Sequence, residues 1–167
     1  LTVTTKHDPN DLLTEVDLTL QKRAVDAIEE AFPGDRFVGE EGSASTLPRE
    51  PSGRCWVMDP IDGTNNFVRG LFPIFGISLA FALNGEPVAG GIALPAREEI
   101  YLAGRNLGAT RNGAELRVSA CQHLEEARLD LDFSGQAERI AMVQRASRLL
   151  YGVGAVRSYG SAVASLA

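Results

Sequence analysis

The stretch from Trp56 to Phe67 constrains this chain more than any other, because an apolar, strand-like run ends there in two closely spaced aspartates. It reads Trp-Val-Met-Asp-Pro-Ile-Asp-Gly-Thr-Asn-Asn-Phe, so Asp59 and Asp62 lie three positions apart on either side of a proline. Proline fixes its own φ and lacks the N–H that would otherwise need a partner. The pattern predicts a strand over residues 55–58 that leads directly into two carboxylates.

These two aspartates supply the kind of ligand that divalent cations use. Mg²⁺ binds oxygen atoms in near-octahedral geometry, and a few carboxylates together with substrate phosphate suit it. Two ions about 4 Å apart can hold the attacking and leaving oxygens of an in-line displacement. Asp59 and Asp62 could each serve one ion or bridge two, and the carbonyl of Ile61 is a further candidate ligand.

The residues that follow the aspartates suit a phosphate group. Gly63 has no Cβ, so a phosphate can approach its backbone closely, and Thr64 starts a polar turn that could open a short helix. Amides at a helix N-terminus form an anion site. The alternative is a strand that ends in a solvated, aspartate-rich turn. The upstream Glu40 and Glu41 favour the metal-binding interpretation, because they bring further carboxylates.

Several stretches of the chain resemble the inositol monophosphatase family of lithium-sensitive, Mg²⁺-dependent sugar phosphatases. Residues 59–67 differ from its signature, Asp-Pro-Ile-Asp-Gly-Thr-Thr-Asn-Phe, only at Asn65. Four other segments are also similar, at residues 6–17 (ending in Thr-x-x-Asp), 37–42 (with Gly-Glu-Glu), 104–119 (with Gly-Ala-x-x-Asn-Gly) and 157–167 (with Arg-Ser-x-Gly-Ser-Ala). The resemblance therefore covers essentially the whole chain.

The resemblance implies an α+β fold, the layered αβαβα sandwich of that family. Residues 1–167 would be one domain and its first large part, with an N-terminal helix and an antiparallel sheet. Family members continue through a Trp-Asp-x-Ala motif whose aspartate completes a metal site, but Trp56 is the only tryptophan here. The helix that usually precedes the Lys6 region is also absent. We therefore expect a chain that is incomplete at both ends, inactive alone and with exposed apolar surface.

The resemblance also implies a metal site. Glu40, Asp59, the Ile61 carbonyl and Asp62 would hold two or three Mg²⁺ ions. Glu41 would be a supporting or loop residue. The family's activity would then be hydrolysis by metal-activated water, without a covalent phospho-enzyme.

Other residues would act on the water and the substrate. The resemblance implies that Asp17 and Thr64 form a hydrogen-bonded pair that orients and deprotonates the attacking water. The amides of Gly63 and Thr64 would hold the phosphate oxygens. Ser158 would face the substrate alcohol, although a small residue at a strand end is an equally good interpretation.

The substrate is less well determined by the sequence. A small alcohol or sugar phosphate such as inositol monophosphate is expected, and histidinol phosphate and fructose-1,6-bisphosphate are the alternatives within the family. Arg69 and Gly70 are mildly reminiscent of histidinol-phosphate members, whereas Asn65 leaves the choice open. A catalytically inactive module that binds metal or a partner is the hypothesis from another class. Family members are commonly homodimers.

Composition and charge bear on which binding partners and which cellular compartment are expected. The net charge of −6 argues against nucleic acid or an anionic membrane surface, both of which attract basic patches. Cys55 and Cys121 show no metal-ligand spacing, so we expect buried free thiols in a reducing compartment. With no visible signal peptide or membrane-length apolar run, the expected location is the cytoplasm.

Periodicity and turn signals predict the order helix, sheet, helix. A helix is expected from a cap at residues 9–11 to about Phe32, with Asp17 at the edge of its apolar stripe, either exposed or paired. A helix is also expected over residues 136–151, and another from Gly160. Strands are expected over 75–83, 88–94, 99–103 and 127–133, with a hairpin at 84–87 and a tight turn at 112–113. Asp130 and Asp132 fit a solvated strand face better than a ligand set. Helices should cover one face of the sheet.

Overall fold

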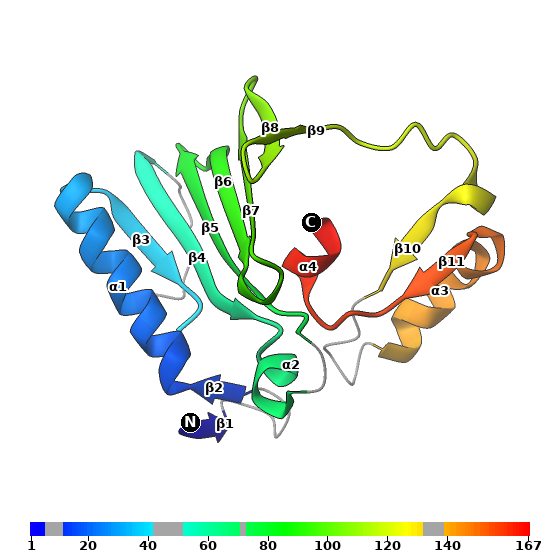
Figure 1. The fold of residues 1–167 in the computed structure, drawn as a ribbon, viewed down its shortest axis with the longest axis horizontal. Coiled ribbons are helices and arrows are strands. Elements are labelled where there is room, and N and C mark those ends of the chain that lie inside the picture. Colours follow the sequence, from blue (N-terminus) through cyan, green and yellow to red (C-terminus); the bar gives the residue numbers. More distant parts are fainter. Residues whose placement is uncertain (6–11, 42–51, 71–72, 132–138) are drawn as a thin grey trace.

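The computed structural model of this chain describes residues 1–5, 12–41, 52–70, 73–131 and 139–167. One large sheet has a long helix beside it, and a smaller part lies at the other side of the molecule (Figure 1). An extended segment joins the last strand of the large sheet to the smaller part. Among the described residues, no helix is both long and apolar enough to cross a membrane.

The large sheet has seven strands in simple sequential order. They are β3 (Arg36–Gly39), β4 (Arg54–Asp62), β5 (Gly76–Leu83), β6 (Glu86–Leu94), β7 (Glu99–Gly104), β8 (Gly108–Arg111) and β9 (Ala114–Leu116). β3 runs parallel to β4, and the other neighbouring pairs are antiparallel. The expectation of a purely antiparallel sheet was therefore wrong at this edge, because residues 37–42 had been assigned to a loop.

The predicted turns between the antiparallel strands are confirmed. Asn84 and Gly85 have φ angles of 52° and 81°, and Asn112 and Gly113 have 48° and 81°. Positive φ at both central residues is the conformation that fits the twist of a two-residue hairpin, and Asn-Gly adopts it at low cost. These local signals set the register of β5 with β6 and of β8 with β9.

The long helix α1 (Glu15–Ala31) begins later than predicted. Thr14 is its N-cap, and Leu12–Thr14 form β2, which pairs with β1 (Val3–Thr5). The expected cap at residues 9–11 lies outside the described residues. The helix starts at Glu15 because Thr14 and Asp17 form a capping box, in which each side chain binds the other residue's backbone N–H.

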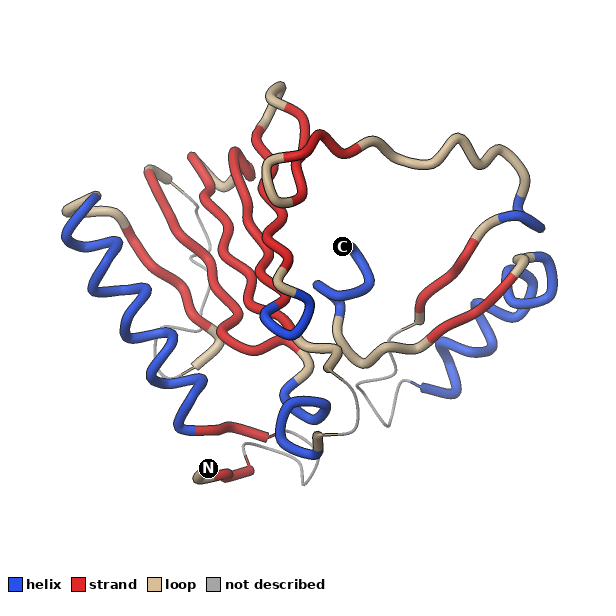
Figure 2. The backbone as a smooth tube through the Cα atoms, viewed as in Figure 1, coloured by secondary structure: helices blue, strands red, loops and turns tan. Residues whose placement is uncertain are grey.

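The smaller part contains a second, parallel pair of strands, β10 (Arg128–Asp130) and β11 (Ala155–Arg157), with α3 (Arg139–Gly152) between them in sequence (Figure 2). β10 is shorter than the predicted strand at 127–133, whose last residues, including Asp132, lie outside the described ones. Asp130 is not simply solvated, because it accepts hydrogen bonds from the backbone of Tyr159 and the hydroxyl of Ser165.

The last helix returns the chain to the large sheet. α4 (Ala162–Leu166) confirms the helix that was expected from Gly160. Its Val163 packs in a buried cluster with Leu94 of β6 and Tyr101 of β7. Gly76 permits this approach, since a Cβ there would lie 2.7 Å from both the Leu94 and the Val163 side chains. The core therefore fixes α4 beside the end of β4.

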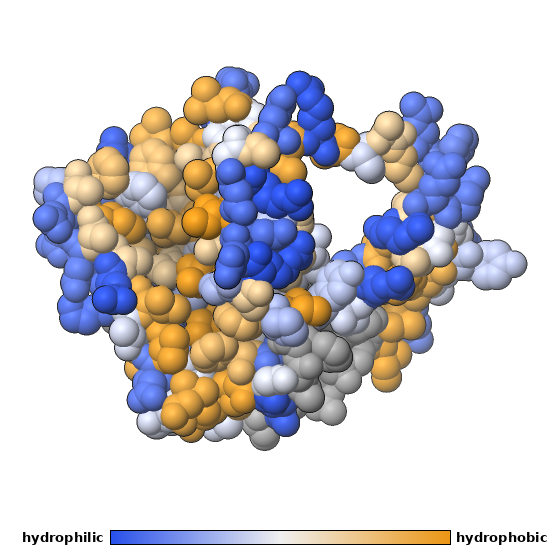
Figure 3. Space-filling view, in the orientation of Figure 1, coloured by the Kyte–Doolittle hydropathy of each residue, from blue (hydrophilic) through white to orange (hydrophobic). Residues whose placement is uncertain are grey.

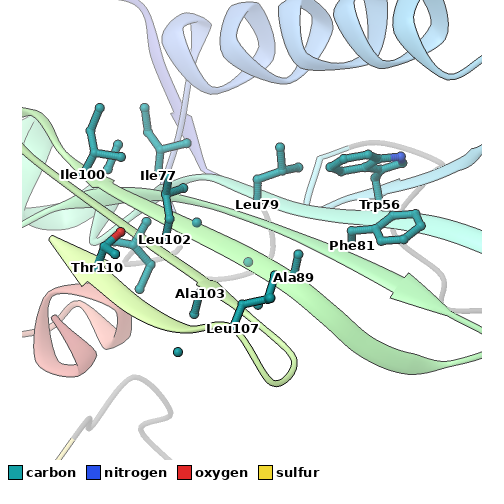
Figure 4. A pocket seen from close by; sticks show the side chains of 16 residues that line it. Trp56, Ile77, Leu79, Phe81, Ala89, Ile100, Leu102, Ala103, Leu107 and Thr110 are labelled. Atoms are coloured by element: carbon teal, nitrogen blue, oxygen red, sulfur yellow. The ribbon is translucent and has the colours of Figure 1, made fainter. Parts of the chain in front are cut away.

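The other face of the large sheet carries an apolar groove on the side of α1. Figure 4 shows Trp56, Leu79, Ile100, Leu102 and Leu107 lining it. Apolar residues are also prominent at the surface in the left half of Figure 3. Ile100 and Leu102 are 54% and 56% exposed, which agrees with the expected apolar surface.

The two cysteines differ from each other. Cys55 in β4 is buried, as predicted, whereas Cys121 is exposed, so the expectation of two buried thiols was wrong. Cys121 lies in the extended segment after β9, which explains its exposure.

Candidate functional site

β4 carries the aspartate motif, and it is longer than the sequence suggested. Pairing with β5 continues through Asp59, breaks, and resumes at Asp62 opposite Gly76. Met58 and Ile61 are 6% and 2% exposed and anchor the strand on both sides of Asp59. Pro60 lies at the break in register, where a missing N–H leaves no donor unsatisfied. The break lies between the two aspartates, whose carboxylates are near enough for the charge of Asp62 to act on Asp59.

Gly63 makes the turn from β4 into α2 (Thr64–Arg69). It has φ of +87°, a left-handed conformation that favours glycine. A Cβ at this position would lie 3.0 Å from both the Ile74 carbonyl oxygen and the Ser161 Cβ. In this structure the space beside Gly63 is occupied by the protein's own chain. Phosphate binding by the amides of Gly63 and Thr64 stays a prediction.

Asp59 lies in a strongly acidic environment. Partial burial raises the pKa of its carboxyl to about 8, with the negative charge of Glu40, a hydrogen bond with Glu40 and the charge of Asp62 acting in the same direction. The amide of Ile61 donates to Asp59 Oδ1 at 3.1 Å and opposes the rise. A cation would relieve the repulsion that the proton now relieves.

Glu40 reaches Asp59 because of the parallel pairing of β3 and β4. Its amide donates to the Met58 carbonyl at 3.2 Å, which continues the ladder beyond Gly39. Gln21 of α1 holds the next residue from both sides: its amide nitrogen donates to the Glu41 carbonyl at 2.8 Å, and its Oε1 accepts from the Glu41 amide at 3.1 Å. Sequence reasoning missed Gln21, since a glutamine on a helix gives no signal of such a contact.

Asp62 is held from the far end of the chain. The Ser161 hydroxyl donates to Asp62 Oδ2 at 2.5 Å, and the Val163 amide donates to the same oxygen at 2.9 Å. Ser161 is the N-cap of α4 and is 1% exposed. Sequence reasoning missed this contact, although the Gly-Ser-Ala at residues 160–162 is a recognisable helix start.

Asp17 is buried at the start of α1. Its Oδ2 accepts hydrogen bonds from the Thr14 amide at 2.8 Å and the Thr14 hydroxyl at 2.5 Å. Its Oδ1 is buried and has no hydrogen-bond partner among the described residues. A buried carboxylate oxygen without a partner costs free energy, so Oδ1 is an open acceptor within this part of the structure. The interpretation of Asp17 as exposed was wrong.

The expected hydrogen bond between Asp17 and Thr64 is not formed in the part of the chain that the structure describes. The Thr64 hydroxyl donates instead to the Ile61 carbonyl at 2.8 Å, the same carbonyl that was predicted as a metal ligand. The neighbouring elements do meet, because α2 contacts β2, which precedes α1. The proposed roles of Asp17 and Thr64 stay predictions.

Ser158 gives no support for substrate contact. It is exposed and directly follows β11, which matches the alternative of a small residue at a strand end. Its proposed role likewise stays a prediction.

The donor set fits Mg²⁺ in its chemistry. All the candidate ligands are oxygens, and Asp59 lies near both Glu40 and Asp62. Within the described ranges, however, no three Asp, Glu, His or Cys side chains are arranged so that they could hold one ion. Asp59 is the carboxylate that has both Glu40 and Asp62 as charged neighbours. Whether each aspartate serves one ion or bridges two stays a prediction.

Comparison with known proteins identifies the family of the chain. Residues 1–167 match the sequence profile of the inositol monophosphatase family. The chain belongs to the inositol monophosphatase family. It is 38% identical to an inositol-1-monophosphatase of Bacillus subtilis, over 100% of this chain and 63% of that protein. It is 41% identical to a fructose-1,6-bisphosphatase/inositol-1-monophosphatase of Thermotoga maritima, over 84% of this chain and 54% of that protein.

A solved structure supports the fold of this inositol monophosphatase family member. An IMPase/NADP phosphatase complexed with Mg²⁺ and phosphate has a TM-score of 0.83 and 26% identity, over 99% of this chain and 60% of that one. The likeness confirms the expected fold class. The chain spans between 54% and 63% of the length of these three proteins.

Proposed function

We propose that the protein containing residues 1–167 is a Mg²⁺-dependent phosphomonoesterase for a small phosphorylated alcohol or sugar. The observation that carries this proposal is the acidic group at the end of β4, where Glu40 and Asp62 lie near the carboxyl of Asp59 and help to raise its pKa. An arrangement that costs free energy without a cation is expected where binding a cation is the purpose.

Different residues of this chain would bind the metal ions, orient a ligand carboxylate and approach the phosphate. Glu40, Asp59, the Ile61 carbonyl and Asp62 would hold two or three Mg²⁺ ions, which supply charge neutralisation and acidify bound water. Ser161 keeps Asp62 directed from α4. The left-handed turn at Gly63 would present backbone amides rather than a side chain to the phosphate.

Asp17 is the best-placed proton acceptor among the predicted residues. Its Oδ1 is buried and has no donor among the described residues, whereas Oδ2 is fixed by Thr14. A carboxylate held in one orientation with one open oxygen suits general-base work. Thr64 would help to place the water, after its hydroxyl turns away from the Ile61 carbonyl.

The relatives indicate the class of substrate, a small phosphorylated alcohol or sugar. The Bacillus protein is named an inositol-1-monophosphatase and the Thermotoga protein a fructose-1,6-bisphosphatase/inositol-1-monophosphatase, so inositol monophosphate and fructose-1,6-bisphosphate are the first candidates. Histidinol phosphate is the third. We further propose lithium inhibition, a cytoplasmic location and a homodimer, and neither nucleic acid nor membrane as a partner.

The test is turnover of the three esters by the protein that contains this chain, with and without Mg²⁺. Asp17→Asn and Thr64→Ala should each lower kcat by about 10²–10⁴-fold while metal binding persists. Asp26→Asn is the matched control, because Asp26 lies on the same helix in an exposed ion pair with Lys22. Metal-dependent thermal stabilisation without turnover of any ester would favour the inactive binding module instead.

A further inference from the structure

The carboxylate of Asp62, a predicted metal ligand, is held by a distant segment of the chain. Both donors to its Oδ2 come from the start of α4, about a hundred residues further along the chain: the Ser161 hydroxyl and the Val163 amide. The other oxygen, Oδ1, accepts no hydrogen bond from the residues that the structure describes. Two donors on one oxygen fix the plane of the carboxylate and leave one oxygen for a ligand.

The position of Ser161 is itself rigid. Its Cβ lies 3.0 Å from the place that a Cβ on Gly63 would occupy, so the two backbones meet without an intervening side chain. On the other side, Val163 lies in the buried cluster with Leu94 and Tyr101. Ser161 therefore has little freedom to move away from Asp62.

We propose that Ser161 is a positioning residue for Asp62, which sets the orientation of this carboxylate for a divalent cation. The inference rests on the proposed function only in taking Asp62 as a metal ligand. Ligand carboxylates bind a cation well only when their own hydrogen bonds hold them, and loss of such a partner commonly weakens metal affinity by about 10–100-fold. The remaining Val163 amide would leave the carboxylate free to rotate about a single contact.

A simpler role for Ser161 is the N-cap of α4. Its hydroxyl oxygen also accepts a hydrogen bond from the Ala164 amide at 3.3 Å, which is an ordinary capping contact. Loss of this contact alone would lower stability without changing the metal site. The two roles are separated by a control on the same helix: Ser165 donates to Asp130, outside the acidic group, and to the Ser161 carbonyl.

The experiment measures Mn²⁺ affinity rather than activity. The protein that contains this chain is prepared as wild type, Ser161→Ala and Ser165→Ala, and free Mn²⁺ is counted from its electron paramagnetic resonance signal during titration. Urea unfolding in EDTA measures stability in parallel. We expect Ser161→Ala to weaken Mn²⁺ binding at least about tenfold and Ser165→Ala to leave it within about twofold, although both lower stability.

The outcomes distinguish this inference from the proposed function. Mn²⁺ binding by Ser161→Ala that equals the wild type overturns the positioning role alone. Equal weakening in Ser161→Ala and Ser165→Ala also overturns it, because loosening of α4 would then explain both. A wild type that binds no Mn²⁺ at millimolar concentration overturns the proposed function, and the inference with it.

Discussion

Asp59→Asn should stabilise the metal-free protein at alkaline pH while it destroys the response to Mg²⁺. The amide keeps the oxygen that accepts from the Ile61 amide, but it carries no charge next to Glu40 and Asp62. A residue placed for cation binding is thus predicted to work against folding when the cation is absent.

The size and sign of the effect follow from the pKa of Asp59. The folded pKa of Asp59 is about 8 and the ordinary value is 3.8. Between pH 3.8 and about pH 8, the folded chain therefore keeps on Asp59 a proton that the unfolded chain has already lost. The unfolded state then binds fewer protons, and the free energy of unfolding falls as pH rises from about 4 to about 8. The full difference corresponds to about 6 kcal/mol. Because the carboxyl is only partly buried, we reduce this to about 3 kcal/mol for solvent screening.

The assay is urea unfolding by circular dichroism at several pH values from 5 to about 8.5, in EDTA and in Mg²⁺. In EDTA, Asp59→Asn should gain stability over the wild type progressively with pH, to about 3 kcal/mol at the alkaline end. Saturating Mg²⁺ at about 100 Kd should stabilise only the wild type, by about 2.7 kcal/mol. A stability difference that does not change with pH, or a variant that is less stable at pH 8.5, would refute the reasoning. Asp26→Asn should show neither effect, since its carboxylate is exposed.

Three further predictions concern stability. Gly63→Ala should lower the free energy of unfolding by about 2 kcal/mol more than Gly34→Ala, because both glycines have positive φ but, of the two, only Gly63 lacks room for a Cβ. Thermal unfolding compares the two variants directly, and equal losses of stability would contradict the packing argument. Thr14→Ala should lower stability by about 2 kcal/mol, since it removes the cap of α1 and a donor to buried Asp17, whereas Thr14→Ser should keep most of the wild-type stability. Equal denaturation midpoints for the two variants would count against the capping role of the hydroxyl. Leu94→Ala should lower the free energy of unfolding by about 2–5 kcal/mol, because this core side chain is 1% exposed. A loss under about 1 kcal/mol in urea unfolding would mean that α4 does not depend on the core.

The sequence determined the features that depend on near neighbours. The apolar run before Asp59 predicted a strand, Thr64 predicted a turn that opens a short helix, and the Asn-Gly pairs predicted a hairpin at 84–87 and a tight turn at 112–113. Each of these follows from φ preferences and side-chain alternation within a few residues. One local signal was overlooked: Thr14 and Asp17 form a Thr-x-x-Asp capping box that sets the start of α1 and buries Asp17.

Tertiary structure decided which groups meet at the end of β4. Glu40 lies beside Asp59 because β3 pairs parallel with β4, and a parallel pairing of a four-residue strand has no local signature. Ser161 reaches Asp62 because Val163 packs into a core that contains Leu94, far from either in sequence. The sequence alone could name the carboxylates, since their chemistry is intrinsic to the side chains. Their orientation, their hydrogen-bond partners and the raised pKa of Asp59 depend on burial and on charges brought together by folding, which only the three-dimensional arrangement sets.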